Sequence, residues 1–262
     1  MQLIDVGVNL TDASFRPDLD IVIERARGVG VRWMIVTGTS VASSESARQL
    51  ARQYPDTLYA TAGVHPHNAR CWDEMTPKRL RELGRSSEVV ALGEMGLDFD
   101  RDFSPRPAQE RVFEAQLELA AEMGMPVFMH ERDARRRFAQ ILGSWRDRLQ
   151  SAAIHCFTGT AEDLAVYLDL DLHIGVTGWI CDERRGLHLR ELVRRIPLER
   201  LMLETDAPYL LPRTLRPAPK RGRNEPAFLP HILNTVAACL ELPPESVAEA
   251  TTRTAHSFFR LP

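Results

Sequence analysis

Short apolar runs alternate with amphipathic segments along the whole chain. Eight runs combine the length and composition typical of strands buried on both faces. They are Leu3–Asn9, Trp33–Gly38, Tyr59–His65, Val89–Glu94, Pro126–His130, Ala152–Cys156, Leu172–Val176 and Leu201–Asp206. Between the strands, apolar residues recur at helical spacing. This spacing predicts helices over Leu19–Gly28, Ser43–Tyr54, Pro77–Gly84, Ala108–Met123, Asp133–Leu142, Ala161–Leu168 and Leu187–Ile196.

Alternating strands and helices indicate a parallel sheet. Eight such units in 262 residues predict one (β/α)8 barrel over residues 1–262, with its site at the carboxyl ends of the strands. An open, doubly wound sheet is the alternative, and it would spread the polar strand-end residues along one edge. One long irregular segment, Ala207–Pro230, follows the last strand and is rich in Pro and Arg. Long loops in compact domains are usually functional.

Four of the predicted strands carry a residue that can bind a metal at or next to their carboxyl end: Glu94, His130, His155 and Asp206. Any one of them alone could be a hydrogen-bonded structural residue or, for Asp206 before Pro208, part of a turn. Together, two imidazoles and two carboxylates can hold a divalent cation and leave positions for water and substrate. The pattern predicts a metal-dependent hydrolase, with Asp206 as a ligand or as the base that takes a proton from water.

Other residues are candidates for substrate contacts. His65 ends the third predicted strand, so we expect it to contact a phosphate or to add a ligand. Trp179 lies near Arg184 and Arg185, and this pairing of an aromatic ring with guanidinium groups suits single-stranded nucleic acid. The last loop adds Arg213, Arg216, Lys220, Arg221 and Arg223. A solvated surface is the alternative for most of these basic residues, but Arg223 precedes Asn224 near the predicted site and is expected to bind substrate.

Composition sets limits on the function. Hydrophobic residues make up 44% of the chain, which is enough for a sizeable core, and the net charge of -3 does not by itself indicate a nucleic-acid partner. The four cysteines have no CxxC spacing, which favours a reducing cytosol over a disulfide-rich secreted protein. We find neither a signal peptide nor a membrane-spanning run. These features predict a cytoplasmic protein that does not enter membranes.

Seven motifs together resemble the TatD family of metal-dependent deoxyribonucleases. They are GVHPH, GEMGLDF, PVFMHERDA, HCFTGT, GVTGW, ETDAPYLLP and RNEPAFLP, and with the first strand they cover the chain from Asp5 to about Pro230. The resemblance implies an amidohydrolase-type (β/α)8 barrel that hydrolyses phosphodiester bonds. The implied substrate is single-stranded DNA digested from its 3′ end, with RNA for some relatives, in DNA repair or degradation. The family's metal ligands fall on the same four residues, and we expect a monomer.

The first strand departs from the family pattern. Most members carry His-x-His there, whereas this chain has Gly7 and Asn9. Gly7 cannot bind a metal, and Asn9 offers one carbonyl oxygen. Fewer imidazoles favour Mg²⁺, with Mn²⁺ and Zn²⁺ as alternatives, and leave either one or two ions.

Two other functions fit the same residues. The barrel hosts many chemistries, so an amidohydrolase or an ester hydrolase acting on aminoacyl-tRNA is one alternative. A nucleic-acid-binding protein without enzymatic activity is the other, and the four retained ligand positions argue against it.

Overall fold

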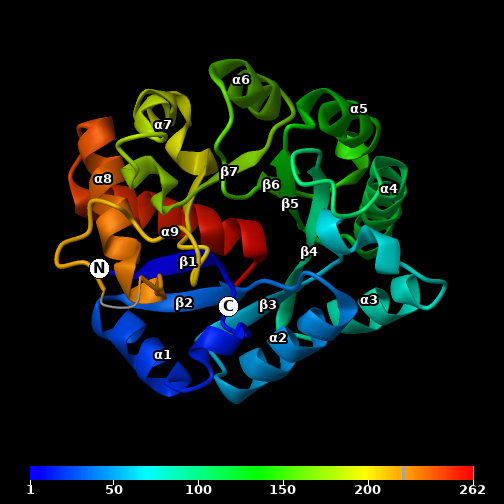
Figure 1. The fold of residues 1–262 in the computed structure, drawn as a ribbon, viewed down its shortest axis with the longest axis horizontal. Helices are drawn as coiled ribbons and strands as arrows, with labels where there is room; N and C mark the ends of the chain where they lie inside the picture. Colours follow the sequence, from blue (N-terminus) through cyan, green and yellow to red (C-terminus); the bar gives the residue numbers. More distant parts are fainter. Residues whose placement is uncertain (220–221, 262) are drawn as a thin grey trace.

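The computed structural model describes residues 1–219 and 222–261. Within them, eight parallel strands pair in chain order. Their bounds are β1 Leu3–Val8, β2 Val31–Val36, β3 Leu58–Ala62, β4 Val89–Asp98, β5 Val127–Arg132, β6 Ala152–Ile154, β7 His173–Val176 and β8 Leu201–Leu203. The Asp206 N–H donates to Gly7 O at 2.8 Å, and the Asn9 N–H donates to Ala207 O at 2.7 Å. These bonds join β1 to the segment after β8, so the predicted barrel is confirmed and an open sheet is excluded (Figure 1).

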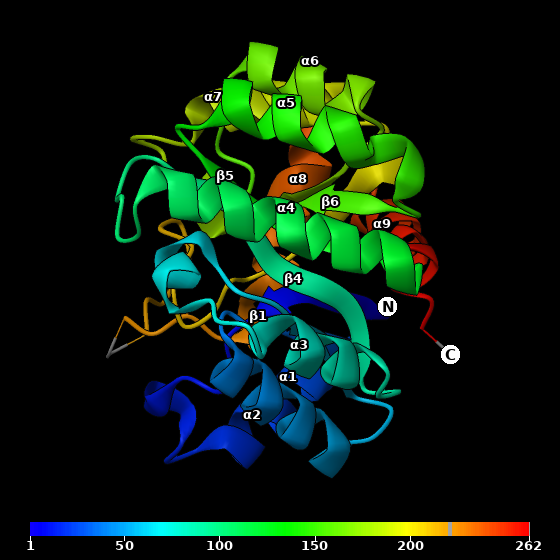
Figure 2. The ribbon, with the colours of Figure 1, turned by 90° about the vertical axis from the view of Figure 1, so that its right-hand side faces the viewer.

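Helices surround the strands (Figures 1 and 2). They are α1 Leu19–Gly28, α2 Val41–Gln53, α3 Thr76–Gly84, α4 Arg106–Met123, α5 Arg135–Trp145, α6 Ala161–Asp169, α7 Leu187–Leu192, α8 Leu229–Leu240 and α9 Pro244–Phe259. The predicted helices match α1 to α7 to within a few residues. Capping explains two of the boundaries. Ser40 and Ser43 form a capping box at the start of α2, and Gly124 ends α4 with a φ of 61°.

Strands β4 and β5 run beyond their predicted metal-competent residues, whereas β8 ends at Leu203, three residues before Asp206. Strand β4 continues past Glu94 to Asp98, and β5 continues past His130 to Arg132. The cause is a shift in register, because Gly93 pairs with Phe128 while Met95 pairs with the next residue, Met129. Glu94 is therefore the extra residue of a β-bulge, which turns its side chain without ending the strand.

The amino end of the barrel is apolar and closed. The side chains of Ile4, Phe128 and Met202 pack inside the strands against Phe258 and Phe259 of α9. Helix α9 lies against β1, and Figure 2 places both chain termini on this side. The carboxyl end of the barrel is left open for chemistry. No helix in residues 1–219 or 222–261 is long and apolar enough to cross a membrane.

Candidate metal centre

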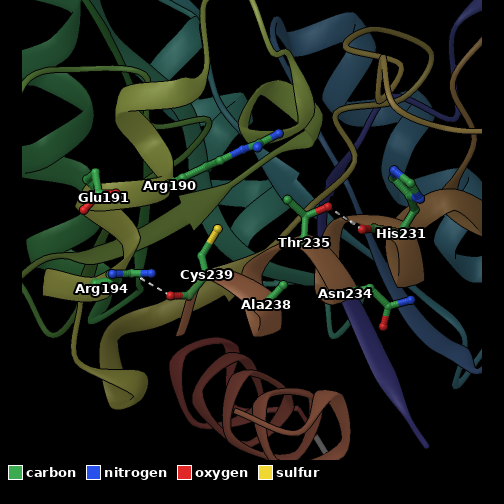
Figure 3. Close-up of a pocket in the computed structure, with 8 residues that line it drawn as sticks. All are labelled: Arg190, Glu191, Arg194, His231, Asn234, Thr235, Ala238 and Cys239. Atoms are coloured by element: carbon green, nitrogen blue, oxygen red, sulfur yellow. Dashed lines mark hydrogen bonds between the residues drawn. The ribbon is translucent and has the colours of Figure 1, made fainter. Parts of the chain in front are cut away.

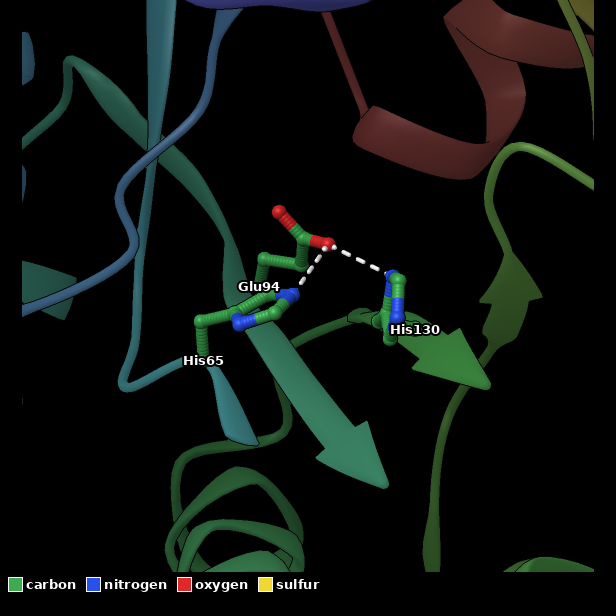
Figure 4. Close-up of side chains that lie close together, drawn as sticks. All are labelled: His65, Glu94 and His130. Atoms are coloured by element: carbon green, nitrogen blue, oxygen red, sulfur yellow. Dashed lines mark ion pairs between the residues drawn. The ribbon is translucent and has the colours of Figure 1, made fainter. Parts of the chain in front are cut away.

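Glu94 lies at the middle of a cluster of three imidazoles. Its Oε1 lies 2.7 Å from His155 Nε2, 3.1 Å from His130 Nδ1 and 3.3 Å from His65 Nε2. Figure 4 shows His65 and His130 pointing at this carboxylate from the two sides of β4. One atom from each of His65, Glu94 and His130 lies within 4.8 Å of the others, so these three side chains could hold one metal ion.

Burial and charge set the ionisation of this cluster. Burial alone would raise the pKa of Glu94, but His155 and the other imidazoles hold it well below its usual range. Burial opposes the charged form of His155, yet Glu94 raises its pKa well above the usual value. For His65 burial dominates and lowers the pKa to about 4. Nδ1 of the neutral His65 accepts a hydrogen bond from the His67 N–H at 3.1 Å, so its ring proton lies on Nε2, which faces Glu94.

Asp98 and His67 extend the cluster. His67 Nε2 lies 2.7 Å from Asp98 Oδ2, and His130 Nε2 lies 3.5 Å from the same oxygen. The His67 ring also packs edge-on against His65, with ring centroids 4.2 Å apart. Asp98 was not singled out from the sequence. The missed signal is the acidic residue four positions after Glu94, on the same continuous strand.

Glu204 is a second residue that the sequence reasoning missed. Its fully buried carboxylate lies inside the barrel, with Oε2 3.4 Å from His155 Nδ1. A Cβ atom at Gly7 or at Gly175 would overlap this carboxylate. Gly7 therefore does more than remove an imidazole, because its missing side chain leaves the space that Glu204 occupies.

Asp206 lies at the edge of the cluster. Asn9 Nδ2 donates to its Oδ1 at 2.9 Å. Burial, with the charges of Glu94 and Glu204, raises the pKa of Asp206 to about 7. Behind Asp206, the fully buried Asp5 accepts a hydrogen bond from the Thr205 N–H at 2.9 Å. This bond fixes the backbone next to Asp206.

Buried polar atoms without a hydrogen-bond partner indicate where a ligand would bind. In the described part of the chain, four buried side-chain atoms lack a hydrogen-bond partner: His130 Nε2, His155 Nδ1, Glu204 Oε2 and His173 Nδ1. Three of them belong to this cluster. Buried polar atoms are rarely left unpaired, and imidazole nitrogens with carboxylate oxygens are the donors that divalent cations take. The residues present therefore fit a divalent metal.

A cavity of about 1410 Å³ opens above the cluster. It is lined by Glu94, His130, His155 and Asp206, and also by the predicted Asn9, His65 and Trp179. The barrel thus brings together seven of the eight predicted site residues.

Arg223 is the exception. Its guanidinium donates to Asp18 at 2.7 and 2.8 Å and to Glu225 at 3.0 Å, and it packs on the Phe15 ring. These contacts tie the last loop to the start of α1 and hold the Arg223 side chain away from the cluster, so its contact with substrate stays a prediction. Of the other basic residues named in this loop, Lys220 and Arg221 lie outside the described residues.

A smaller cavity of about 490 Å³ lies between α7 and α8 (Figure 3). Its polar groups are largely engaged with the backbone. Arg194 Nε donates to Cys239 O at 2.7 Å, and the Thr235 hydroxyl donates to His231 O at 3.0 Å. None of the residues around Glu94 lines this smaller cavity.

A parallel barrel with imidazoles and carboxylates gathered at its carboxyl end has the architecture of the barrel-type metal-dependent hydrolases. Within that class, the chain belongs to the family of TatD-related DNases, whose pattern matches residues 4–260. The resemblance found in the sequence motifs is confirmed.

Individual relatives agree with this assignment. The chain is 52% identical over 259 residues to the 3′-5′ ssDNA/RNA exonuclease TatD of Edwardsiella piscicida, covering 99% of this chain and 100% of that one. It is 54% identical over 235 residues to the protein of the same name from Pantoea ananatis, covering 90% of each. Among solved structures, a TatD homologue from Escherichia coli K12 matches with a TM-score of 0.90 and 26% identity, covering 99% of this chain and 98% of that one.

Proposed function

We propose that this protein is a divalent-metal-dependent 3′-5′ exonuclease that hydrolyses the phosphodiester bonds of single-stranded DNA, and of RNA as a second substrate. Family membership and the names of relatives about 50% identical over nearly the full chain support the activity and its direction. The observation that carries the proposal is the Glu94 carboxylate with three imidazoles within 3.3 Å of it, below a cavity of about 1410 Å³.

The metal would be held by Glu94, His130, His155 and Asp206, with Asn9 at the edge. Glu204 supplies a further buried oxygen close to His155. When bound, a divalent ion lowers the pKa of water and offsets charge on a phosphodiester. Mg²⁺ is the ion that we propose, because Glu94, Asp98, Glu204 and Asp206 give the site four carboxylates. Mn²⁺ and Zn²⁺ are the competing ions, since imidazoles suit them better.

The protein's own groups have separate roles in this proposal. Asp206, with its pKa raised to about 7 by burial, takes the proton of the attacking water. The new P–O bond forms as the bond to the leaving nucleotide oxygen breaks, and that oxygen takes up a proton. The neutral His65 ring donates a hydrogen bond to a non-bridging oxygen, and Trp179 offers a flat ring for base stacking.

We further propose that residues 1–262 form one domain that acts as a monomer in the cytoplasm, in DNA repair or degradation. The free state of Cys71, Cys156, Cys181 and Cys239 supports a reducing compartment.

The test is digestion of a 5′-labelled single-stranded DNA oligonucleotide and its RNA equivalent, with EDTA, Mg²⁺, Mn²⁺ or Zn²⁺. The variant is Glu94→Gln, and the matched control is Glu249→Gln, which changes an exposed carboxylate on α9. We expect a metal-dependent ladder that shortens from the 3′ end with wild type and control, and none with Glu94→Gln. If the folded wild-type protein cleaves neither oligonucleotide with any ion, the proposal fails, and ester or amide substrates come next.

A further inference from the structure

The arginines that line the large cavity lie on one side of it. They come from the last residue of β5 and from the segments after β4, β5 and β7, and they are Arg101, Arg132, Arg135, Arg136, Arg137 and Arg185. The segments after β1, β2, β3 and β8 contribute no arginine or lysine to the described lining. Apart from the cluster residues and His67, they contribute the uncharged Asn9, Thr39, Asn68, Tyr209 and Leu210. Among the described residues, the arginines of the cavity rim therefore lie on one side of it.

Three of the six arginines are held by carboxylates. Arg132 pairs with Asp100 at 2.9 Å, Arg135 with Asp163 at 3.0 Å, and Arg137 with Glu110 at 2.8 Å. The other three, Arg101, Arg136 and Arg185, are exposed, and none of them makes an ion pair within residues 1–219 and 222–261. Free guanidinium groups on three separate segments can each take a phosphate.

Trp179 lies on the same side of the cavity. The Arg185 guanidinium lies 5.3 Å from the centre of its ring. A flat ring beside an unpaired cation can accept a base and the phosphate next to it. Asp133 and Glu162 also line this side, so a polyanionic strand is attracted at three separate points and not by a uniformly positive surface.

We propose that the long, 5′ part of the strand leaves the site over Arg101, Arg136 and Arg185, with a base against Trp179. The 3′-terminal nucleotide then lies toward Asn9, on the side to which the described chain contributes no arginine or lysine. This direction of the strand rests on the proposed function, because an enzyme that removes nucleotides from the 3′ end has one nucleotide on one side of the broken bond. The rest of the strand, with nearly all of its phosphates, lies on the other side and requires the cations.

The triple variant Arg101→Ala/Arg136→Ala/Arg185→Ala tests this direction. The matched control is Arg32→Ala, because Arg32 is also exposed, lies 5.8 Å from the centre of the Trp33 ring, and belongs to β2, near the opposite end of the barrel. The substrates are a 20-nucleotide single-stranded DNA, a dinucleotide and bis(p-nitrophenyl) phosphate. Each is assayed at several salt concentrations with the ion that gives the highest wild-type activity.

For the triple variant we expect the KM for the 20-nucleotide strand to rise by about 30-fold or more, with kcat within about twofold. The slope of log kcat/KM against log salt should become shallower by about 2, which is the loss of three phosphate contacts on a single strand. Activity on the dinucleotide and on bis(p-nitrophenyl) phosphate should stay at the wild-type level, as should every value for Arg32→Ala.

Two results would overturn this inference and leave the proposed function standing. One is a wild-type KM and salt slope in the triple variant, and the other is an equal loss of activity on all three substrates. Absence of cleavage by the wild-type protein on every substrate would instead remove the proposed function, and the inference with it. Because the small substrates report on the metal centre without the arginines, the two failures are distinguishable.

Discussion

The two ends of this barrel are built from the same strands and differ in almost every other respect. At the amino end, Ile4 and Met202 pack against Phe258 in a cluster of buried apolar side chains. At the carboxyl end, the same strands present charged groups, three of whose buried atoms have no hydrogen-bond partner within the described chain. The comparison indicates that the apolar amino end stabilises the fold. The carboxyl end holds buried polar groups for chemistry, and holding them costs stability. Changes at the amino end should therefore leave turnover nearly intact, and changes at the carboxyl end should leave the protein folded.

The largest effect is expected from Glu94→Gln at the carboxyl end. The substitution keeps the size of the side chain but removes the charge that the three imidazoles surround. We expect turnover on single-stranded DNA to fall about 10³-fold, equivalent to about 4 kcal/mol. The metal-free variant should stay folded, with a lower thermal midpoint because the buried His155 loses the charge that raises its pKa. Steady-state kinetics with a melting curve checks both values, and a loss of fold in this variant would break the comparison.

Phe258→Ala makes the converse change at the amino end. The side chain is 3% exposed, against 53% for Ile21 on α1. Removing the buried ring should lower the free energy of unfolding by about 3 kcal/mol, because a cavity is left in the core. Ile21→Ala should change it by less than about 0.5 kcal/mol. Denaturant titration measures the loss. Turnover of folded Phe258→Ala should match wild type, and a large fall in turnover would contradict the separation of the two ends.

Asp5→Asn tests a polar group that lies between the two ends. Burial raises the pKa of Asp5 from 3.8 to about 8. Between these values the folded chain holds a proton that the unfolded chain has released, so stability falls as the pH rises through that range. The slope is about 1.4 kcal/mol per pH unit for one group. We expect wild type to lose about 2 kcal/mol more than Asp5→Asn between pH 6 and pH 8.

Parallel urea titrations at the two pH values measure this difference. Equal losses in wild type and Asp5→Asn would mean that Asp5 is already ionised in the folded protein at pH 6.

The smallest effect is expected at the junction of the two ends. The Phe128 ring lies 5.0 Å from the His155 ring and 6.3 Å from the Phe259 ring, measured between centroids. Phe128→Leu should cost about 1 kcal/mol of stability and lower turnover only a few-fold. Calorimetry and kinetics on one preparation would show whether stability and turnover both fall in Phe128→Leu. In Phe258→Ala only stability should fall.

The sequence predicted the barrel because apolar runs and helical spacing are local signals. It predicted His155 and Asp206 as well, because each lies just beyond a short strand, one residue after β6 and three residues after β8. It could not predict that β4 runs through Glu94 to Asp98, because the bulge depends on pairing with β5. Glu204 was missed for a similar reason, as its place inside the barrel exists only because Gly7 and Gly175 lack side chains.

The basic loops illustrate the same limit. Arg223 appeared to be available for substrate in the sequence, but Asp18, which is far away along the chain, binds its guanidinium. Arg136, which lines the cavity, was not singled out from the sequence. Ion pairs between distant segments decide which arginines stay free, and no local pattern encodes them.

The most direct test of the central claim is calorimetric titration of Mn²⁺ into metal-free protein. Wild type and Phe258→Ala should both bind with the same affinity at one or two sites per chain. Glu94→Gln should bind about 100-fold more weakly or not at all, since the carboxylate that brings the three imidazoles together is gone. Equal Mn²⁺ affinity in wild type and Glu94→Gln would contradict the account, because the ion would then be held somewhere other than this cluster.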